Sequence, residues 1–476
     1  MTELRTSLWH ELLRARRQRT LRLSALLLGA LLVTGFALEA ARYAGERRML
    51  AGMQARVDAE WRNQPDRHPH RASHFGTYAF RPPGVLGFFD PGVESYSGTL
   101  TFLEPHQRNL PAFSDAAESS ELLRFGRPSV AFVLQVLVPL LLFCTTFSSV
   151  AGEREAGTWQ LSLSQGVRAR SLLLGKALGA LAAVCAWLVP LLGAGWLAAL
   201  ASGLSQPSRD MLARSALLVS AYIVYLGSCA LLGVWLSSLH RRPQTALLSA
   251  LALWLGLWII LPQMATSLAS DSVPAPSRAE LESGIARAVR SHGDSHDPNN
   301  SHFAELKAAT LSRHGVDSIE NLPINFAGIV MTEAERISSE EFNAHHERMT
   351  AAFTAQNARM LELGLFTPLL ALRSFSMSMA GTDVPHVARF NSDVEQYRYR
   401  FIQQLNALHI NEIRWQDDKT QRVSRSEWSR FEAFHPQSPD VGWALGHAWR
   451  PLGALVVWGC LALLALLLSA QRSLES

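Results

Sequence analysis

The stretch Gly152–Lys176, GEREAGTWQLSLSQGVRARSLLLGK, lies between two long apolar runs and decides how the rest of the chain is interpreted. It carries charged residues at both ends, and its middle holds the apolar residues Trp159, Leu161, Leu163 and Val167. A short segment held between two membrane spans cannot move far from the membrane. It therefore either lies along the membrane surface or faces the water beyond, where another protein can contact it.

Apolar windows recur along the 476-residue chain. Each holds about 20 residues with almost no charge, which as a helix crosses about 30 Å of hydrocarbon. The windows predict a mainly α membrane protein with six transmembrane helices. The predicted spans are 21–38, 128–151, 174–201, 211–237, 244–264 and 451–470.

Two large polar inserts, 39–127 and 265–449, lie between these spans. The first is dense in Gly and Pro between short β-prone runs, which predicts short strands and loops. The second reads as mainly helical, with long helices expected over about 333–363 and 384–409. Each of these helices has an apolar stripe, so the two either pair as a helical hairpin or pack on separate cores.

Local signals mark helix ends in the second insert. Ser277 with Glu280, and Thr332 with Glu335, each fit a capping box, in which side chains bond the open backbone N–H groups at a helix start. Gly315 lies where a helix end is expected, and so does Gly364.

Basic residues predict the orientation in the membrane. Residues 1–20 are expected to form a helix with leucines on one face and arginines around the rest. This segment is either an interfacial helix on the cytoplasmic surface or a plain basic leader that sets topology. With six spans, it lies on the same side as 152–173, Arg241–Arg242 and Arg472, and such a bias marks the cytoplasm. Both termini are then cytoplasmic, and both inserts are extracytoplasmic.

Composition excludes several classes of protein. The formal net charge of +4 is too small to suggest a nucleic-acid binder. All four cysteines fall inside predicted spans, so we expect neither a disulfide framework nor a cysteine metal cluster. The first apolar run follows a long basic leader without a convincing cleavage site, so no cleavable signal peptide is expected.

The predicted spans contain almost no ionisable residues, which disfavours an ion-coupled transporter. The polar residues Gln135, Tyr222 and Tyr225 are interpreted as helix-packing contacts rather than as a substrate site. A phosphate-binding loop is not evident either, because Gly175–Lys176 lacks the upstream glycine and Ala177 replaces the magnesium-binding hydroxyl. If ATP and Mg²⁺ drive this protein, another chain must bind them.

The segment after the second span reads Gly152-Glu153-Arg154-Glu155-x-Gly157-Thr158, followed by basic residues including Arg168 and by Gly175-Lys176. It resembles the cytoplasmic coupling region of type-2 ABC exporter permeases. The resemblance implies a permease in the inner membrane of a bacterium, working with a separate ATPase subunit and a second permease copy, identical or homologous.

Further motifs are similar to the branch of that family with an enlarged external domain of uncharacterised function. They are Asp90-Pro91-Gly92, His296-Asp297-Pro298-Asn299, Gly315-Val316, Leu322-Pro323-x-Asn325, Gly328, Phe366-Thr367-Pro368-Leu369-Leu370 and Ala380-Gly381-Thr382-Asp383. This resemblance implies a large periplasmic domain, which could dock an external partner, but no known substrate.

The coupling segment can also be interpreted from its residues alone. Glu153 and Glu155 flank Arg154 at the end of a span, and we expect Gly157 to form a turn and Thr158 to cap a short helix. A motor protein could push on such a helix. Alternatively, the charges are solvated and serve only topology.

Histidines in the second insert raise the question of a metal site. His292, His296 and His302 could bind zinc or copper, with Asp297 beside them. Pro298 interrupts the segment, however, so these residues do not share a regular helical face, and a solvated loop is the alternative. His346-Glu347 begins a zinc-protease pattern that Thr350 fails to complete, and we find no nucleophile elbow.

Three functions follow as hypotheses. The first is the permease subunit of an ATP-driven exporter, with the path near the second and fifth spans. The second is a membrane scaffold or mechanotransmitter, which an ATPase moves without any molecule crossing the membrane. The third is an external enzyme anchored by six spans, which depends only on the histidines.

Overall fold

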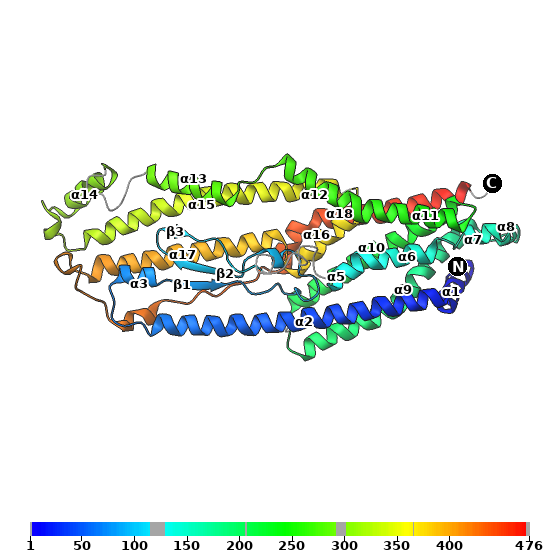
Figure 1. Cartoon of the computed structure of the whole chain (residues 1–476), viewed down its shortest axis with the longest axis horizontal. Coiled ribbons are helices and arrows are strands. Elements are labelled where there is room, and N and C mark those ends of the chain that lie inside the picture. Colours follow the sequence, from blue (N-terminus) through cyan, green and yellow to red (C-terminus); the bar gives the residue numbers. More distant parts are fainter. Residues whose placement is uncertain (1, 115–128, 205–206, 292–300, 365, 473–476) are drawn as a thin grey trace.

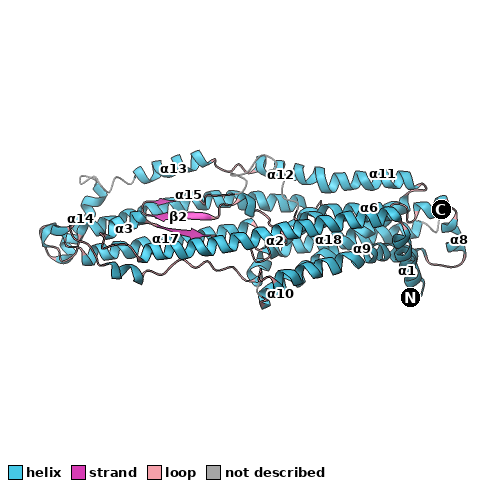
Figure 2. Cartoon of the chain, turned by 60° about the horizontal axis from the view of Figure 1, so that its bottom comes forward, coloured by secondary structure: helices cyan, strands magenta, loops and turns pink. Residues whose placement is uncertain are grey.

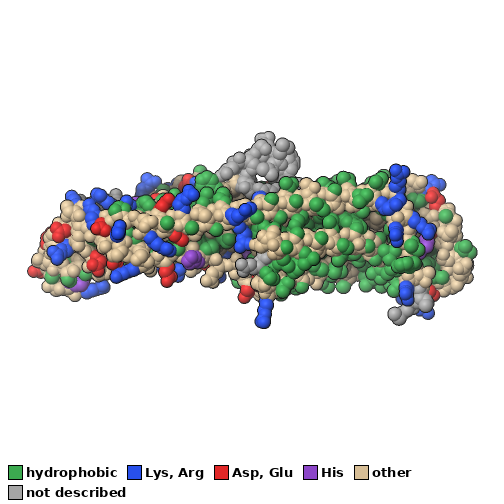
Figure 3. Space-filling view, turned by 90° about the horizontal axis from the view of Figure 1, so that it is seen from below, with side chains coloured by type: hydrophobic (Ala, Val, Ile, Leu, Met, Phe, Trp, Pro, Cys, Tyr) green, Lys and Arg blue, Asp and Glu red, His purple; other side chains and the backbone are tan. Residues whose placement is uncertain are grey.

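The computed structural model describes residues 2–114, 129–204, 207–291, 301–364 and 366–472. The molecule is elongated, with a helical bundle in one half (Figures 1 and 2) and a lobe with more charged side chains, the polar lobe, in the other (Figure 3). The polar lobe consists of α3, β1–β3, α13–α15, α17 and the second half of α2. Side chains over the bundle are mostly hydrophobic, with Lys and Arg gathered at both of its ends (Figure 3).

Within the described ranges, six helices are long and apolar enough to cross a membrane, as predicted. The first, third, fourth and sixth are α2 (Arg19–Arg62), α9 (Ala169–Ala201), α10 (Arg209–Leu239) and α18 (Val441–Arg472). The second consists of α5 (Val130–Phe132), η3 (Val133–Leu137), α6 (Val138–Thr146) and α7 (Ala151–Glu155). The fifth consists of α11 (Pro243–Trp254), η4 (Leu255–Ile260) and α12 (Leu261–Ser272).

Two of these helices extend furthest beyond their predicted spans. The first insert was expected to begin at residue 39, but α2 has 44 residues and continues into the polar lobe. Its continuation is supported by Arg42, which forms ion pairs with Glu39 at 2.9 Å and with Glu46 at 2.7 Å on the same helix. Likewise, α18 begins at Val441 instead of residue 451. Hydropathy marks the apolar part of a helix but not its polar extension.

A small antiparallel sheet lies in the polar lobe. It consists of β1 (Thr77–Phe80), β2 (Leu100–Glu104) and β3 (Gln107–Arg108), in the order β1-β2-β3. The register pairs Tyr78 with Phe102 and Glu104 with Gln107, so β2 and β3 are joined by a two-residue turn.

The helices of the polar lobe follow the predicted capping signals in part. They are α3 (Pro69–Phe75), α13 (Arg278–Ser291), α14 (Ser301–His314), α15 (Phe326–Gly364) and α17 (Val384–Glu412). Ser277 Oγ accepts from the Glu280 N–H at 3.2 Å, and Glu280 Oε2 accepts from the Ser277 N–H at 2.8 Å, which confirms that capping box. The predicted start at Thr332 is wrong, because the Asn325 side chain accepts from the Ala327 N–H and α15 begins one residue after Asn325.

The helices α15 and α17 lie side by side, but their apolar stripes face different partners (Figure 1). Phe342 of α15 packs with Leu281 and Ile285 of α13. Phe401 of α17 packs with Trp61 of α2 and with Trp428. Of the two arrangements considered from the sequence, packing on separate cores is therefore the one observed.

A buried charge network joins α15 to α17. The guanidinium of Arg398, only 1% exposed, donates to Glu335 Oε1 at 2.6 Å and to both carboxylate oxygens of Glu395 at 2.8 Å. It also donates to the backbone oxygen of Glu104 at 3.1 Å, and Ser339 Oγ donates to Glu395 Oε1 at 3.0 Å. Two helices and the sheet thus meet at one arginine.

The polar lobe and the bundle share a continuous core. The helix α16 (Pro368–Ala380) packs against α10 and α18 of the bundle. Its Leu372 and Phe375 belong to the same buried cluster as Leu86 and Phe88 of the first insert and Leu142 of the bundle. Segments from both predicted inserts therefore pack on the bundle, which the sequence did not indicate.

Candidate functional site

The predicted coupling segment lies at the end of the molecule where α1 begins and α18 ends (Figure 1). We call α1 (Thr2–Arg17), α7 and α8 (Thr158–Ser164) the terminal platform. Gly157, with φ of +73°, forms the predicted turn between α7 and α8, a conformation that favours glycine. The predicted cap at Thr158 is wrong, because Thr158 Oγ1 donates backwards to the Glu153 carbonyl at 3.3 Å.

Trp159 fixes α8 to the bundle. Its indole is buried in a cluster with Val150, Leu173 and Leu466, which belong to three different candidate spans. The Arg154 guanidinium lies 5.9 Å from the Trp159 ring centroid and donates to the Ser238 carbonyl of α10. A force applied to α8 would therefore reach several bundle helices.

The helix α1 packs closely on α9 because two glycines face it. A Cβ at Gly175 would lie 2.5 Å from Ser7 Cβ, and a Cβ at Gly179 would lie 2.7 Å from Glu11 Cβ. Ser7 Oγ also donates to the Leu172 carbonyl at 3.1 Å. Small residues four positions apart allow this approach between helices. The packing accounts for Gly175 without any phosphate-binding role.

Lys176 joins the two parts of the terminal platform. Its ammonium is 3% exposed and lies 3.1 Å from Glu11 Oε1 of α1 and 2.5 Å from Glu153 Oε1 of α7. One buried cation thus holds two carboxylates from segments far apart in the sequence. Replacing only one of these charged residues would be costly, because a buried charge would lose its partner.

The predicted coupling residues therefore fall into two groups. Glu153, Arg154 and Lys176 form contacts inside the protein, and Gly152 is half-buried beside them. The others, Glu155, Gly157, Thr158 and Arg168, are exposed, and the exposed residues near them in sequence include Leu161 and Arg170. Leu161 is 58% exposed, so this surface offers an apolar side chain. These exposed residues are the ones that a partner could contact.

A second polar site lies where the lobe meets the bundle. The Asp90 carboxylate accepts from Ser376 Oγ at 2.5 Å and from Gln135 Nε2 at 3.4 Å, and Gln135 Nε2 also donates to Tyr222 OH at 2.9 Å. Burial raises the pKa of Asp90, although these hydrogen bonds oppose it. Gly92, with φ of +49°, lets this loop approach Thr382, whose Oγ1 donates to the Asp90 carbonyl.

Gln135 lies in a π-helical segment, η3, and faces a second one, η4. Trp258 Nε1 of η4 donates to the Gln135 carbonyl at 3.0 Å, and Tyr225 OH donates to the same carbonyl. Segments of this kind occur often at functional sites. Gln135, Tyr222 and Tyr225 therefore connect the second, fourth and fifth spans, in agreement with the packing role expected for them.

The bundle holds more buried charge than the sequence analysis recognised. Arg214 of α10, which is 0% exposed, donates to Asp210 Oδ2 at 2.7 Å and to the carbonyls of Met379 and Pro439. Lys176 of α9 is also buried. The expectation that the predicted spans contain almost no ionisable residue is therefore wrong. Arg214 lies near the start of its helix and bonds carbonyls of α16 and of the segment before α18, so we interpret it as a structural attachment rather than as part of an ion path.

The buried residue Glu94 should make the stability of the protein depend on pH. Burial raises its pKa from 4.5 to about 7, against the effects of Arg81 and the Gly84 N–H. The folded protein therefore binds a proton at Glu94 more tightly than the unfolded chain does. Protonated Glu94 contributes its full stabilisation below about pH 4.5, and this contribution is lost as the pH rises to about 7. We expect Glu94→Gln to flatten the fall in melting temperature between about pH 5 and about pH 8. The same pH dependence in Glu94→Gln as in the unchanged chain would contradict this prediction. The control is Glu362→Gln, which removes a carboxylate from an exposed ion pair.

The histidines considered from the sequence do not come together among the described residues. His292 and His296 lie outside the described residues, and so does Asp297. His302 Nε2 lies 2.9 Å from Glu333 Oε1, and His346 Nδ1 lies 2.8 Å from the Phe342 carbonyl.

The sequence analysis missed two features of the lobe. One is a cleft of about 610 Å³ between the sheet, α15 and α17, with Arg108, Asn343 and Arg398 in its wall. The other is a group of three histidines, His70, His74 and His106, of which the first two could have been noticed from their spacing of four.

One comparison with known families covers part of the second insert. Residues 278–437, from α13 to the end of the polar lobe, match the family described as a domain of unknown function (DUF3526). No curated protein and no solved structure matches the chain.

Proposed function

We propose that this protein is the membrane-spanning permease subunit of a type-2 ABC exporter, energised by a separate ATPase subunit that binds ATP and Mg²⁺. The observation that carries the proposal is the terminal platform. A short helix between the second and third spans, α8, presents the exposed apolar residue Leu161 and is followed by the exposed basic residue Arg168, while Trp159 fixes α8 to the bundle. An ATPase that closes on ATP would push on α8.

Lys176 offers a route for that push into the bundle. The ion pairs to Glu153 and Glu11 tie α7, α9 and α1 together, and α2 follows α1 after a single residue. Because buried ion pairs and close glycine contacts leave little slack, movement of α8 would carry these helices with it. The two π-helical segments, η3 and η4, lie in the second and fifth spans. The transport path in this proposal runs next to these two spans.

The orientation and location belong to the same proposal. Basic residues at the terminal platform support a cytoplasmic position for it, with both termini on that side and the polar lobe in the periplasm of a bacterium. A second copy, identical or homologous, would complete the transporter.

A double substitution on the exposed face of the terminal platform tests the role of the ATPase. We expect Leu161→Asp with Arg168→Glu to weaken ATPase binding by about 30-fold, as for a central interface contact worth about 2 kcal/mol. Co-purification of the ATPase with the tagged chain measures this. The matched control is Phe353→Asp with Arg348→Glu, an exposed apolar and basic pair on α15. Equal ATPase recovery from both variants would refute the proposed contact.

A specific observation favours the second candidate function, a mechanotransmitter without transport. The helix α2 runs from the bundle into the polar lobe, and its Trp61 donates to the Trp428 carbonyl at 3.1 Å within an aromatic cluster. One rigid element therefore connects the terminal platform with the far lobe. ATP-dependent change in the lobe without substrate uptake into sealed inverted vesicles would select this function over export.

A further inference from the structure

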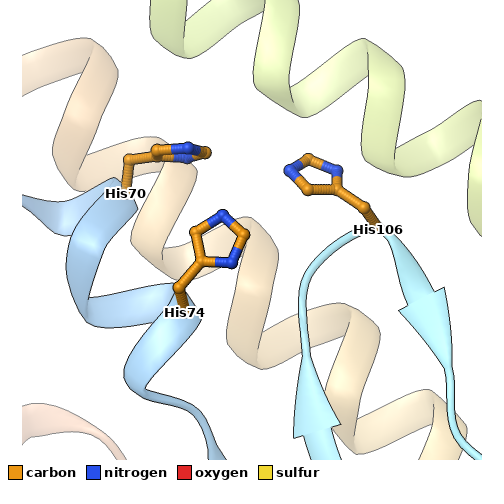
Figure 4. A group of neighbouring side chains, drawn as sticks. All are labelled: His70, His74 and His106. Atoms are coloured by element: carbon orange, nitrogen blue, oxygen red, sulfur yellow. The ribbon is translucent and has the colours of Figure 1, made fainter.

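Three histidines from two distant segments face one another in the polar lobe (Figure 4). His70 and His74 are four residues apart on α3, so both lie on one side of the helix. His106 comes from the turn between β2 and β3. One ring nitrogen of each histidine can be chosen so that all three lie within 4.8 Å of one another.

We propose that His70, His74 and His106 bind one divalent transition-metal ion, zinc or copper. Neutral imidazole is a preferred ligand of both ions. Three protein ligands would leave a fourth position for water or an external ligand, and His74 is exposed, so an ion can enter from solvent. This site goes beyond the proposed export function and does not depend on it.

The backbone at His106 supports a role for its side chain. His106 has φ of +64°, and it follows Pro105 in the two-residue turn between Glu104 and Gln107. A turn with Pro at its second position and positive φ at its third favours Gly or Asn at that third position. A histidine there is strained, and strain of this kind concentrates at functional sites.

A carboxylate lies behind His106, as is usual for metal-binding histidines. Glu335 Oε2 accepts from the His106 N–H at 2.9 Å and lies 3.8 Å from His106 Nδ1. Glu335 is itself held by Arg398 at 2.6 Å. A small rotation of the ring would bring Nδ1 within hydrogen-bond distance of this carboxylate, the arrangement that orients many metal-binding histidines.

The positions of the rings fit a site that closes on binding. The ring centroids of His70 and His74 are 4.8 Å apart, and that of His106 lies 6.1 and 5.8 Å from them. Zinc–nitrogen bonds of about 2.0–2.1 Å in a tetrahedron require nitrogens about 3.3 Å apart. Small side-chain rotations supply this contraction.

The adjacent group of His68, His409 and Asp418 is a weaker candidate. His409 Nε2 lies 2.7 Å from Asp418 Oδ1, which also accepts from Asn325 Nδ2 at 2.7 Å. His68 Nδ1 accepts from the His70 N–H, which caps α3. Hydrogen bonds within the protein already use these atoms.

The test uses the full chain, purified in detergent without a polyhistidine tag and titrated with Zn²⁺ and with Co²⁺. We expect about one ion per chain and the visible absorption of tetrahedral Co²⁺. We expect His74→Ala and His106→Gly each to weaken Zn²⁺ binding by at least about 100-fold. His106→Gly also relieves the positive φ, so the metal-free variant should melt at the same or a higher temperature.

The controls are His314→Ala, at an exposed position on α14, and His409→Ala in the adjacent group. Both should bind Zn²⁺ as the unchanged chain does. The proposal is overturned if the unchanged chain binds no stoichiometric Zn²⁺, or if His106→Gly binds it equally well. It is also overturned if His409→Ala loses binding while His74→Ala keeps it.

Discussion

Replacing Arg398 by methionine is expected to destabilise the polar lobe by about 3–5 kcal/mol. The substitution removes the guanidinium that both buried carboxylates share, and leaves Glu395 with the longer contact to Arg108 at 3.9 Å. Methionine fills much of the space of the arginine stem, so the effect reports the lost charge more than a cavity. The free energy of unfolding of the lobe, measured by pulse proteolysis of the full chain in detergent, gives the loss.

Two variants separate this effect from a general effect on α17. Arg389→Ala, at an exposed ion pair with Asp393 on the same helix, should cost less than about 1 kcal/mol. The triple variant Arg398→Met, Glu335→Gln, Glu395→Gln removes all three charges and should recover part of the lost stability. Equal stability of Arg398→Met and Arg389→Ala would show that the network does not hold the lobe together.

Gly179→Leu is expected to detach α1 from α9 and reduce ATPase binding by about tenfold or more, a loss of at least about 1.4 kcal/mol. A Cβ at residue 179 would already lie 2.7 Å from Glu11 Cβ and 2.8 Å from the Leu8 carbonyl. The added side chain must push α1 away, which also separates Glu11 from Lys176. Faster proteolysis within α1, together with reduced ATPase co-purification, measures the effect.

The matched control is Gly193→Leu on the same helix, where a Cβ would meet nothing within 4 Å. Both variants add the same apolar side chain to α9, so they differ mainly in their contact with α1. If Gly179→Leu binds the ATPase as tightly as Gly193→Leu does, α1 is not part of the surface that the motor protein uses.

Hydropathy was sufficient for the bundle, because a helix crossing hydrocarbon must be apolar over a known length. It was not sufficient for the ends of the helices. Residues 39–62 of α2 are polar and carry ion pairs along their own helix, so they look like the start of a loop. Local capping chemistry was reliable at Ser277 but misleading at Thr332, where Asn325 upstream already begins the helix.

Contacts between distant segments could not be predicted from one sequence. The apolar stripes of α15 and α17 left open whether these helices pair through them, and in the structure Arg398 of α17 joins the two helices through Glu335 of α15. A charged residue in a polar insert looks solvated unless its partners are known. The same holds for the candidate metal site, because His70 and His74 are close in sequence whereas His106 joins them only through the fold.

The coupling segment shows what sequence and structure each contribute. The motif identified Glu153, Arg154 and Arg168, but it did not separate the residues facing inward from those facing outward. Lys176 looked like part of a basic surface and instead lies buried between Glu11 and Glu153. The exposed Leu161, which the motif does not include, is the better probe of a partner.

The most direct test of the account is the accessibility of residue 161 in the working complex. Leu161→Cys would be introduced after the four native cysteines, Cys144, Cys185, Cys229 and Cys460, are replaced by alanine. We predict that a membrane-impermeant maleimide fails to label it in intact cells, labels it in inverted vesicles, and is blocked there by the bound ATPase. Labelling in intact cells, or equal labelling with and without the ATPase in an active complex, would contradict the account.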